Sequence, residues 1–173
     1  MKKQTAFIAL GSNMGRRMAN LRRALTLLRN GGGVRLVRMS KVYETSPVGP
    51  RQRDFLNATI RIETDLSPRA LLLRLQEVER AIGRTRIKRK SGQKWGPRPI
   101  DLDILFYGKV RVKLRGLTIP HPRYRERKFV LKPLADIAGT FVPPGSKRSV
   151  AQMVARLTDA GQKVKLHTNQ ILP

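Results

Sequence analysis

The stretch that most constrains the fold is residues 55–83, where a strand pattern runs directly into a helix pattern. In FLNATIRIET (55–64), apolar and polar residues alternate, which is the period of a strand with two different faces. In DLSPRALLLRLQEVERAIG (65–83), apolar residues recur every three or four positions, as in an amphipathic helix. Ser67 is the expected N-cap, Pro68 the first helical residue and Gly83 the C-terminal stop.

The rest of the chain adds elements in an order that favours an antiparallel sheet packed with helices. Strands are expected at 5–10, 34–45, 55–64, 99–107 and 163–166. Helices are expected at 16–30, 65–83 and 149–158, with 124–138 partly helical and 109–120 irregular or hairpin-like. This order predicts an α+β sandwich, and the length fits a single domain over residues 1–173.

The composition supports a globular chain without a membrane segment. The chain is 40% hydrophobic, enough for a real core, and no apolar run reaches the length that a membrane-spanning helix needs. The start, MKKQTAFIALGSN, has too short an apolar part for a signal peptide and is interpreted as a first strand. The absence of cysteine excludes a disulfide framework and a thiolate metal site. A cytoplasmic protein is therefore expected.

The charge is extreme for a folded chain. Lys and Arg number 37 against 11 Asp and Glu, which gives a net charge of +26. Such a protein attracts anions, whether nucleic acid, acidic membranes or phosphorylated small molecules. Taken alone, the charge favours an RNA-binding protein of ribosomal type.

Two of the few acids stand inside the otherwise apolar segment WGPRPIDLDILFYG (95–108). On a strand, Asp101 and Asp103 point to the same face while Leu102 points to the core. Two carboxylates this close repel each other unless a cation lies between them. Carboxylate oxygens suit Mg²⁺, which takes further ligands from water and substrate phosphates. The pair therefore indicates a magnesium site for a phosphate-bearing substrate; the alternative is a solvated strand face paired with Lys or Arg.

The segment before these aspartates, GRTRIKRKSGQKWGPR (83–98), holds seven Lys and Arg and no acid among its sixteen residues. A cationic loop beside a carboxylate pair can close over a polyphosphate and exclude water. The same residues fit a nucleic-acid-binding loop or a merely solvated one. Neither a P-loop nor a GxGxxG pattern occurs, so side chains and metal would have to hold any phosphates. The GSNMG stretch (11–15) is interpreted as an ordinary strand-to-helix turn.

The segment KWGPRPIDLDIL (94–105) resembles the signature of the 6-hydroxymethyl-7,8-dihydropterin pyrophosphokinases. The pattern is a basic residue, Gly-Pro-Arg, two residues, Asp-aliphatic-Asp and two aliphatics. Further blocks resemble the family in the same order: FIALGSNMG, YETSPVGP, DFLNATIRIET, EVERAIGRTR, LTIPHPRY and RKFVLKPLADIA. The ordered set, from about residue 5 to 145, is far more specific than any one block.

The resemblance implies a ferredoxin-like α+β fold and a folate-biosynthesis reaction. The intact β,γ-diphosphate of ATP would pass to the hydroxymethyl oxygen of the pterin, with release of AMP. It implies two Mg²⁺ as cofactors, ATP as co-substrate and hydroxymethyl-dihydropterin as acceptor. A monomer is expected, without specific binding to nucleic acid or membrane.

The resemblance also implies roles for individual residues. The metal ligands would be Asp101 and Asp103, joined in catalysis by Arg84, Arg86 and Arg98. The nucleotide contacts would be Gln76, Glu79, Arg98, Ile104, His121 and Arg127. The pterin pocket would be formed by Thr45, Ser46, Val48, Phe55, Asn57, Trp95 and Phe129.

Elementary chemistry agrees with several of these roles. The Asn57 amide can donate and accept together, as a pterin edge requires. Phe55 and Phe129 could stack on a flat ring. The alternatives are a solvated strand position for Asn57, ordinary core packing for the two Phe, and a structural role for His121. Glu79 could equally pair with a neighbouring arginine of its helix.

The sequence departs from the family's pattern in four ways. Phe55 stands where many relatives have Tyr, so a hydroxyl contact is absent. Pro122 follows His121 where an aromatic residue is common, which puts one nucleotide contact in doubt. The loop between Arg86 and Trp95 is longer than in compact relatives. The charge of +26 is unusual for a small-molecule kinase.

The main competing hypothesis is a basic RNA-binding protein with a ferredoxin-like sheet. Against it stand the nine aromatic residues of the whole chain, with no aromatic-rich strand, and an acidic pair that would repel phosphates without metal. A magnesium-dependent nuclease is a third hypothesis, for which two acids on one strand are too few. An enzyme should form AMP from ATP only with pterin and Mg²⁺, whereas RNA affinity should fall steeply with salt.

Overall fold

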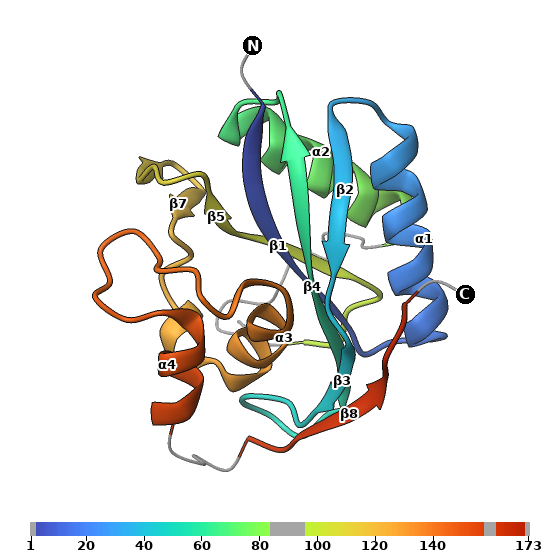
Figure 1. Ribbon diagram of the computed structural model, residues 1–173. Helices are drawn as coiled ribbons and strands as arrows, with labels where there is room; N and C mark the ends of the chain where they lie inside the picture. The colour runs from blue at the N-terminus through green and yellow to red at the C-terminus, as the bar shows by residue number, and fades with distance from the viewer. Residues whose placement is uncertain (1–2, 84–95, 158–161, 172–173) are drawn as a thin grey trace.

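The computed structural model describes residues 3–83, 96–157 and 162–171, and it confirms the predicted mixture of helices and an antiparallel sheet (Figure 1). The elements in chain order are β1 (Gln4–Ser12), α1 (Arg17–Asn30), β2 (Val34–Met39), β3 (Val42–Thr45), β4 (Phe55–Thr64), α2 (Pro68–Ala81), β5 (Asp101–Tyr107), β6 (Val112–Leu114), β7 (Leu117–Ile119), the 3-10 helix η1 (Tyr124–Glu126), α3 (Lys128–Ala138), α4 (Val150–Arg156) and β8 (Val164–Thr168).

The main sheet follows the order β5-β1-β4-β3-β8, with β2 also paired to β4. All of the pairs are antiparallel. Strand β5, which carries the two aspartates, is therefore at one edge of the sheet. Strands β6 and β7 form a separate hairpin, as the 109–120 segment suggested. The closing strand β8 pairs with β3, which gives the C-terminal part of the chain a place in the sheet.

The prediction of one continuous strand at 34–45 is wrong, because this segment forms two strands, β2 and β3, separated by Ser40 and Lys41. The buried Ser40 explains the break. Its backbone N–H donates to the Thr59 carbonyl at 2.9 Å, while its hydroxyl accepts from the Thr59 N–H at 2.8 Å. The hydroxyl thus takes the place of a backbone carbonyl in the ladder. Strand β4 pairs with β3 through its first residues and with β2 through its last ones.

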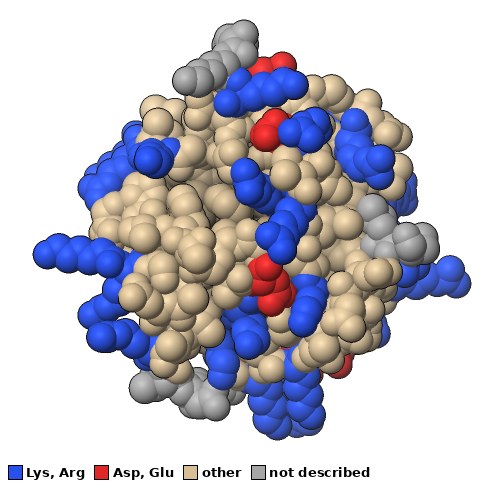
Figure 2. Space-filling view, in the orientation of Figure 1, with Lys and Arg blue, Asp and Glu red and all other residues tan. Residues whose placement is uncertain are grey.

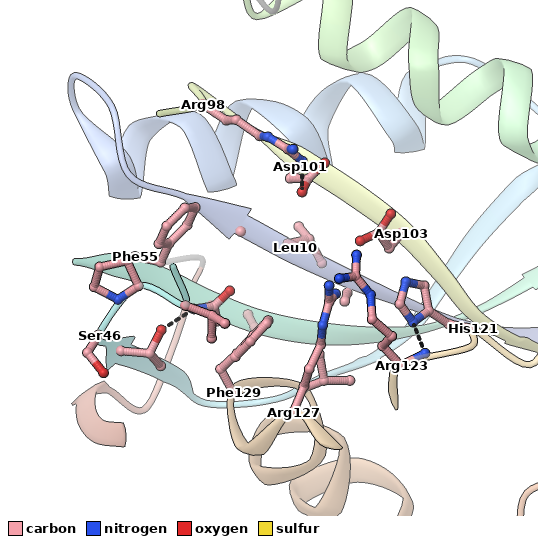
Figure 3. Close-up of a pocket in the computed structure, with 18 of the residues that line it drawn as sticks. Leu10, Ser46, Phe55, Arg98, Asp101, Asp103, His121, Arg123, Arg127 and Phe129 are labelled. Atoms are coloured by element: carbon pink, nitrogen blue, oxygen red, sulfur yellow. Dashed lines mark hydrogen bonds and ion pairs between the residues drawn. The ribbon is translucent and has the colours of Figure 1, made fainter. Parts of the chain in front are cut away.

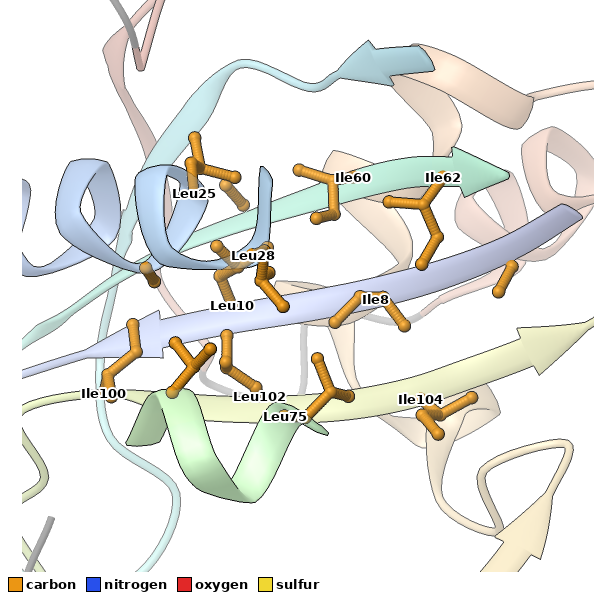
Figure 4. Packing of buried hydrophobic residues seen from close by; sticks show 14 of the residues in the cluster. Ile8, Leu10, Leu25, Leu28, Ile60, Ile62, Leu75, Ile100, Leu102 and Ile104 are labelled. Carbon is orange, nitrogen blue, oxygen red and sulfur yellow. The ribbon is translucent and has the colours of Figure 1, made fainter. Parts of the chain in front are cut away.

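Helices cover both faces of the sheet. On one face, apolar side chains of β1, β4 and β5 pack against α1 and α2 (Figure 4). On the other face, Phe7 and Phe106 pack with Tyr124 of η1 and with the apolar side of α3, against which α4 lies. The alternation of 55–64 indicated one apolar and one polar face of β4. Both faces are buried in the structure, because α3 covers the face that carries the polar residues. Asn57 and Thr59 are therefore buried, which excludes a solvated position for Asn57.

Helix α2 starts where its sequence predicted. The Ser67 hydroxyl accepts a hydrogen bond from the Ala70 N–H at 3.2 Å, and Pro68 is the first helical residue. Gly83 follows the helix with a φ of +97°, a conformation that favours glycine. Among the residues that the structure describes, no helix is long and apolar enough to cross a membrane.

Candidate active site

A pocket of about 210 Å³ opens on the α3 side of the sheet, above β1, β4 and β5. Its walls come from the β3–β4 connection, the segment before β5, the stretch around η1 and the start of α3 (Figure 3). Most of the predicted site residues line it: Thr45, Ser46, Val48, Phe55, Asn57, Arg98, Asp101, Asp103, His121, Arg127 and Phe129. Three others, Arg84, Arg86 and Trp95, lie outside the described residues.

The sheet register explains why the floor of the pocket is open. Asp101 lies opposite Gly11 of β1, and Gly11 in turn lies opposite Asn57 of β4. Asp103 lies opposite Ala9. Since cross-strand partners share a face, small residues separate the two aspartates from the Asn57 amide. A Cβ at Gly11 would stand 3.0 Å from Asn57 Oδ1, so a side chain here would crowd the amide.

Both aspartates project from the pocket face of β5 (Figure 3), as the spacing predicted. Leu102 is buried in the core on the opposite face (Figure 4). Arg98 Nη1 forms an ion pair with Asp101 Oδ2 at 2.5 Å. Arg98 therefore lies beside the acidic pair, and Asp101 partly offsets its charge.

The GSNMG stretch forms the turn that the sequence indicated, and it has a second role. Its polar side chains hold the segment that leads into β5. Asn13 Oδ1 accepts from the Arg98 N–H at 2.7 Å, and the Asn13 N–H donates to the Arg98 carbonyl at 3.1 Å. The buried Ser12 hydroxyl donates to the Pro99 carbonyl, which also accepts from the Asn20 amide. Sequence reasoning missed these supports, since their partners are more than 75 residues away along the chain.

Three cationic or basic side chains face the aspartates from the α3 side. His121, Arg123 and Arg127 line the pocket, and Figure 3 shows both arginines reaching toward Asp103. Burial, followed by the nearby charges of Arg127 and Arg123, lowers the pKa of His121 to about 4. Burial and the neighbouring Arg123 also lower the pKa of the Arg127 guanidinium. This end of the pocket is therefore preorganised for an anion, with a neutral imidazole among the arginines.

The hydrogen bonds of His121 indicate which ring nitrogen carries its proton. His121 Nδ1 accepts from the Arg123 N–H at 3.2 Å. In a neutral imidazole, the other nitrogen, Nε2, then carries the proton and can donate to a phosphate oxygen. Arg123 was not predicted individually, although it stands in the LTIPHPRY block that carried part of the resemblance.

The opposite end of the pocket is less charged. Asn57 Nδ2 donates to Thr45 Oγ1 at 2.6 Å, so the two buried polar side chains form one unit. Ser46 is tied to the C-terminal segment, because it exchanges two hydrogen bonds with the backbone of Lys163. Phe55 and Phe129 add aromatic surface, and the Arg127 guanidinium carbon lies 5.4 Å from the Phe129 ring centroid. This end has the donors, acceptors and flat apolar surfaces that a heteroaromatic ring requires.

Three predicted nucleotide contacts do not line the pocket. The Ile104 side chain is packed in the core between the sheet and α1–α2, on the opposite side of the sheet from the pocket. Gln76 is half-buried on α2. Glu79 is buried and its carboxylate accepts from the Leu102 N–H at 2.8 Å, on the edge of β5 away from β1. It therefore supports the backbone between the two aspartates.

The residues present fit a magnesium ion. Two carboxylates on one face of a strand, with room between them and the cationic wall, are the donor set that Mg²⁺ uses when water and phosphates complete its shell. Within the described ranges, no cluster of three or more Asp, Glu, His or Cys occurs. A site built of protein ligands alone, as for structural zinc, is thus not present in that part of the chain.

Comparison with known proteins gives consistent results. The 7,8-dihydro-6-hydroxymethylpterin-pyrophosphokinase (HPPK) family matches residues 7–139. The pyrophosphokinase of Bacillus subtilis is 47% identical over 133 residues, which are 76% of this chain and 77% of that protein. That of Haemophilus influenzae is 41% identical over 156 residues, 90% of this chain and 94% of that protein. Both are named 2-amino-4-hydroxy-6-hydroxymethyldihydropteridine pyrophosphokinases.

Longer relatives contain a similar region as one part. The mitochondrial folate synthesis bifunctional protein of Arabidopsis thaliana is 52% identical over 136 residues, which are 78% of this chain but 24% of that protein. The crystal structure of wild-type Plasmodium falciparum HPPK-DHPS has the same fold, with a TM-score of 0.70 at 14% identity over 89% of this chain. This chain covers 44% of that one. The family match and the identity to the bacterial proteins show that this chain belongs to the 7,8-dihydro-6-hydroxymethylpterin-pyrophosphokinase family.

Proposed function

We propose that this chain transfers the diphosphate of ATP to 6-hydroxymethyl-7,8-dihydropterin, giving AMP and the pterin diphosphate ester, in folate biosynthesis. The observation that carries the proposal is the division of the pocket into two chemically different ends. Asp101, Asp103 and the arginines suit a nucleotide's phosphates, whereas Asn57 and the two phenylalanines suit a flat ring. Family membership supports the same reaction.

The proposed reaction needs positioning and charge neutralisation more than covalent chemistry from the protein. Arg98, Arg123 and Arg127 would hold phosphate oxygens through charge-assisted hydrogen bonds and stabilise negative charge on the transferred group. Nε2 of His121 would donate a further hydrogen bond without adding charge. Two Mg²⁺, held by Asp101 and Asp103, would act as Lewis acids on the phosphate oxygens.

The pterin end would orient the acceptor. Thr45 fixes the Asn57 amide, which can then pair with the edge of the ring while Phe55 and Phe129 contact its faces. Gly11 leaves the space in which the ring's substituent could approach the phosphates beside Asp101. Orientation of this kind lowers the entropic part of the barrier.

The proposal is tested by measuring AMP release from ATP with hydroxymethyl-dihydropterin and Mg²⁺. AMP should form in step with the pterin diphosphate ester, and omission of either the pterin or the metal should abolish it. ATP hydrolysis without the pterin, or the formation of ADP, would contradict the assignment.

The lowered pKa of His121 predicts a pH dependence of stability. The folded pKa of about 4 lies below the ordinary value of 6.5, so the unfolded state binds the proton first as the pH falls. This residue's contribution to the free energy of unfolding is therefore complete above pH 6.5 and is lost between there and about pH 4. We expect His121→Asn to lose less stability than the parent as the pH falls through this range. Urea unfolding of both proteins at a series of pH values measures the difference. Parallel losses in the two proteins would contradict the prediction.

The contact of Glu79 with the Leu102 N–H predicts a positioning role for this carboxylate. In Glu79→Gln the amide oxygen can still accept the hydrogen bond, so Mn²⁺ affinity and turnover should change only severalfold. Glu79→Ala leaves a buried N–H without its partner, which costs about 1–3 kcal/mol of stability. Loss of such support should weaken Mn²⁺ binding about 10–100-fold, measured by electron paramagnetic resonance. If the Gln variant is as impaired as the Ala variant, the charge of Glu79 matters directly and a positioning role is wrong.

A further inference from the structure

A second cationic site lies outside the pocket, where α4 and the loop before it meet η1. A hollow of about 400 Å³ is lined there by Arg125, Gly145, Ser146, Lys147, Arg148, Met153, Arg156 and Leu157. Arg111, from the turn before β6, lies against the backbone of Gly145. We name Arg111, Arg125, Lys147, Arg148 and Arg156 the α4 cation cluster. None of these residues lines the pocket that holds the aspartates.

Among the described residues, the Arg125 guanidinium is held by neutral partners, and the Arg111 guanidinium lies against the backbone of Gly145. Arg125 donates from Nε to the Tyr124 hydroxyl at 2.9 Å and from Nη2 to the Gly145 carbonyl at 2.9 Å. Its guanidinium carbon also lies 5.4 Å from the Tyr124 ring centroid. The Arg111 guanidinium occupies the space in which a Cβ of Gly145 would stand. The positive charge is thus fixed by neutral partners.

All five cations of the cluster are exposed. Lys147 and Arg148 belong to the loop and Arg156 to the last turn of α4. Within the described part of the chain, no salt bridge involves any member of the cluster. The segment 139–157 contains no Asp or Glu; the acids nearest in sequence to cluster members are Glu126, next to Arg125, and Asp159, three residues after Arg156. Figure 2 shows Lys and Arg side chains projecting at the side of the molecule where this loop lies.

We propose that the α4 cation cluster binds the phosphate backbone of single-stranded RNA without sequence preference. An excess of 26 positive charges is far more than one nucleotide substrate requires, and it implies affinity for a polyanion. Cations from separate segments line one open hollow, so a phosphate chain bound there would contact several of them. Tyr124, the aromatic ring beside the cluster, is buried beneath Arg125, so bases cannot stack on it and contact is confined to the backbone.

An acidic membrane would be attracted by the same charges, but the surface is less suited to it. Membrane-surface binding is strongest for an amphipathic helix with a large apolar face. The α4 helix has seven residues, and its buried side faces α3. A concave cationic surface favours the narrower phosphate backbone of RNA over a broad bilayer.

The test compares two triple variants that each remove three positive charges. The site variant is Lys147→Gln, Arg148→Gln and Arg156→Gln. The matched control is Arg23→Gln, Arg29→Gln and Arg38→Gln, three exposed arginines on α1 and β2. Binding of a fluorescein-labelled oligouridine is measured by anisotropy over a salt titration, and AMP release and thermal unfolding verify that both variants remain folded.

In the site variant, the slope of log affinity against log salt should become less steep by about 2. Each phosphate contact on a single strand contributes about 0.7 to this slope, and the variant removes three cations. The control variant should keep most of the parent's slope, and AMP release should be unchanged in both. Equal losses in the two variants would show that RNA affinity is spread over the surface and would overturn the proposal. Binding to phosphatidylglycerol vesicles without binding to RNA would also overturn it.

Discussion

Replacing Asp103 by alanine should lower the turnover of AMP release about a thousandfold. Among the residues that the structure describes, the acidic groups lining the pocket are the two carboxylates of β5. The proposed metal site therefore loses half of its protein ligands when one of them is removed. Metal-ion catalysis is worth several kcal/mol of transition-state stabilisation, and about 4 kcal/mol corresponds to a factor of roughly a thousand. Mn²⁺ affinity, measured without substrates, should fall together with turnover.

A matched control for this variant is Asp65→Ala. Asp65 is exposed and directly follows β4, ten residues along the strand from Phe55 at the pocket. Its removal changes the net charge by the same amount but leaves the pocket intact, so turnover should stay within about twofold. An Asp103→Ala protein with near-normal turnover would refute the metal site and the phosphate end of the pocket with it.

Truncation of Phe106 to alanine should lower the free energy of unfolding by about 3–5 kcal/mol. The Phe106 side chain is fully buried and lies within 6.2 Å of Phe7, 4.9 Å of Tyr124 and 5.2 Å of Phe141, centroid to centroid. Edge-on contacts of this kind add to the area that the ring buries. Because Tyr124 belongs to η1, the same cavity would also loosen the segment that carries Arg123 and Arg127.

The appropriate comparison is Leu73→Ala, which removes an apolar side chain that is about half exposed on α2. Its loss should cost less than about 1 kcal/mol, because little buried surface disappears. Chemical denaturation of both variants and the parent measures the difference. A Phe106→Ala protein as stable as Leu73→Ala would show that the aromatic cluster does not hold α3 and η1 against the sheet.

The sequence predicted the local elements well where one periodicity dominated. Strand β4 and helix α2 stand within a few residues of their predicted bounds, because alternation, the Ser67 cap and the Gly83 stop are properties of the residues themselves. The prediction was wrong at 34–45, where the interruption depends on a hydroxyl that pairs with Thr59 of a neighbouring strand. No local pattern contains that partner.

The candidate site was predicted in part. Most of the residues indicated by the resemblance converge on one pocket, although their binding roles stay predictions. Arg123 was missed as an individual residue, and the predicted nucleotide contact of Glu79 remains untested while its carboxylate supports the Leu102 backbone. Burial of the two polar residues Asn57 and Thr59 could not be predicted from alternation, because α3 arrives from a distant part of the chain to cover them.

The sequence alone determined the α+β class, the acidic pair on one strand face and the excess of positive charge, since these follow from backbone period and composition. Only the tertiary structure decided what stands opposite those aspartates. Small Ala9 and Gly11 open the floor, Asn13 and Ser12 fix the entry to β5, and the arginines arrive from the far side of the pocket. The physical reason is that a binding site is set by distances between side chains that are remote in sequence, and only the packed sheet and helices define those distances.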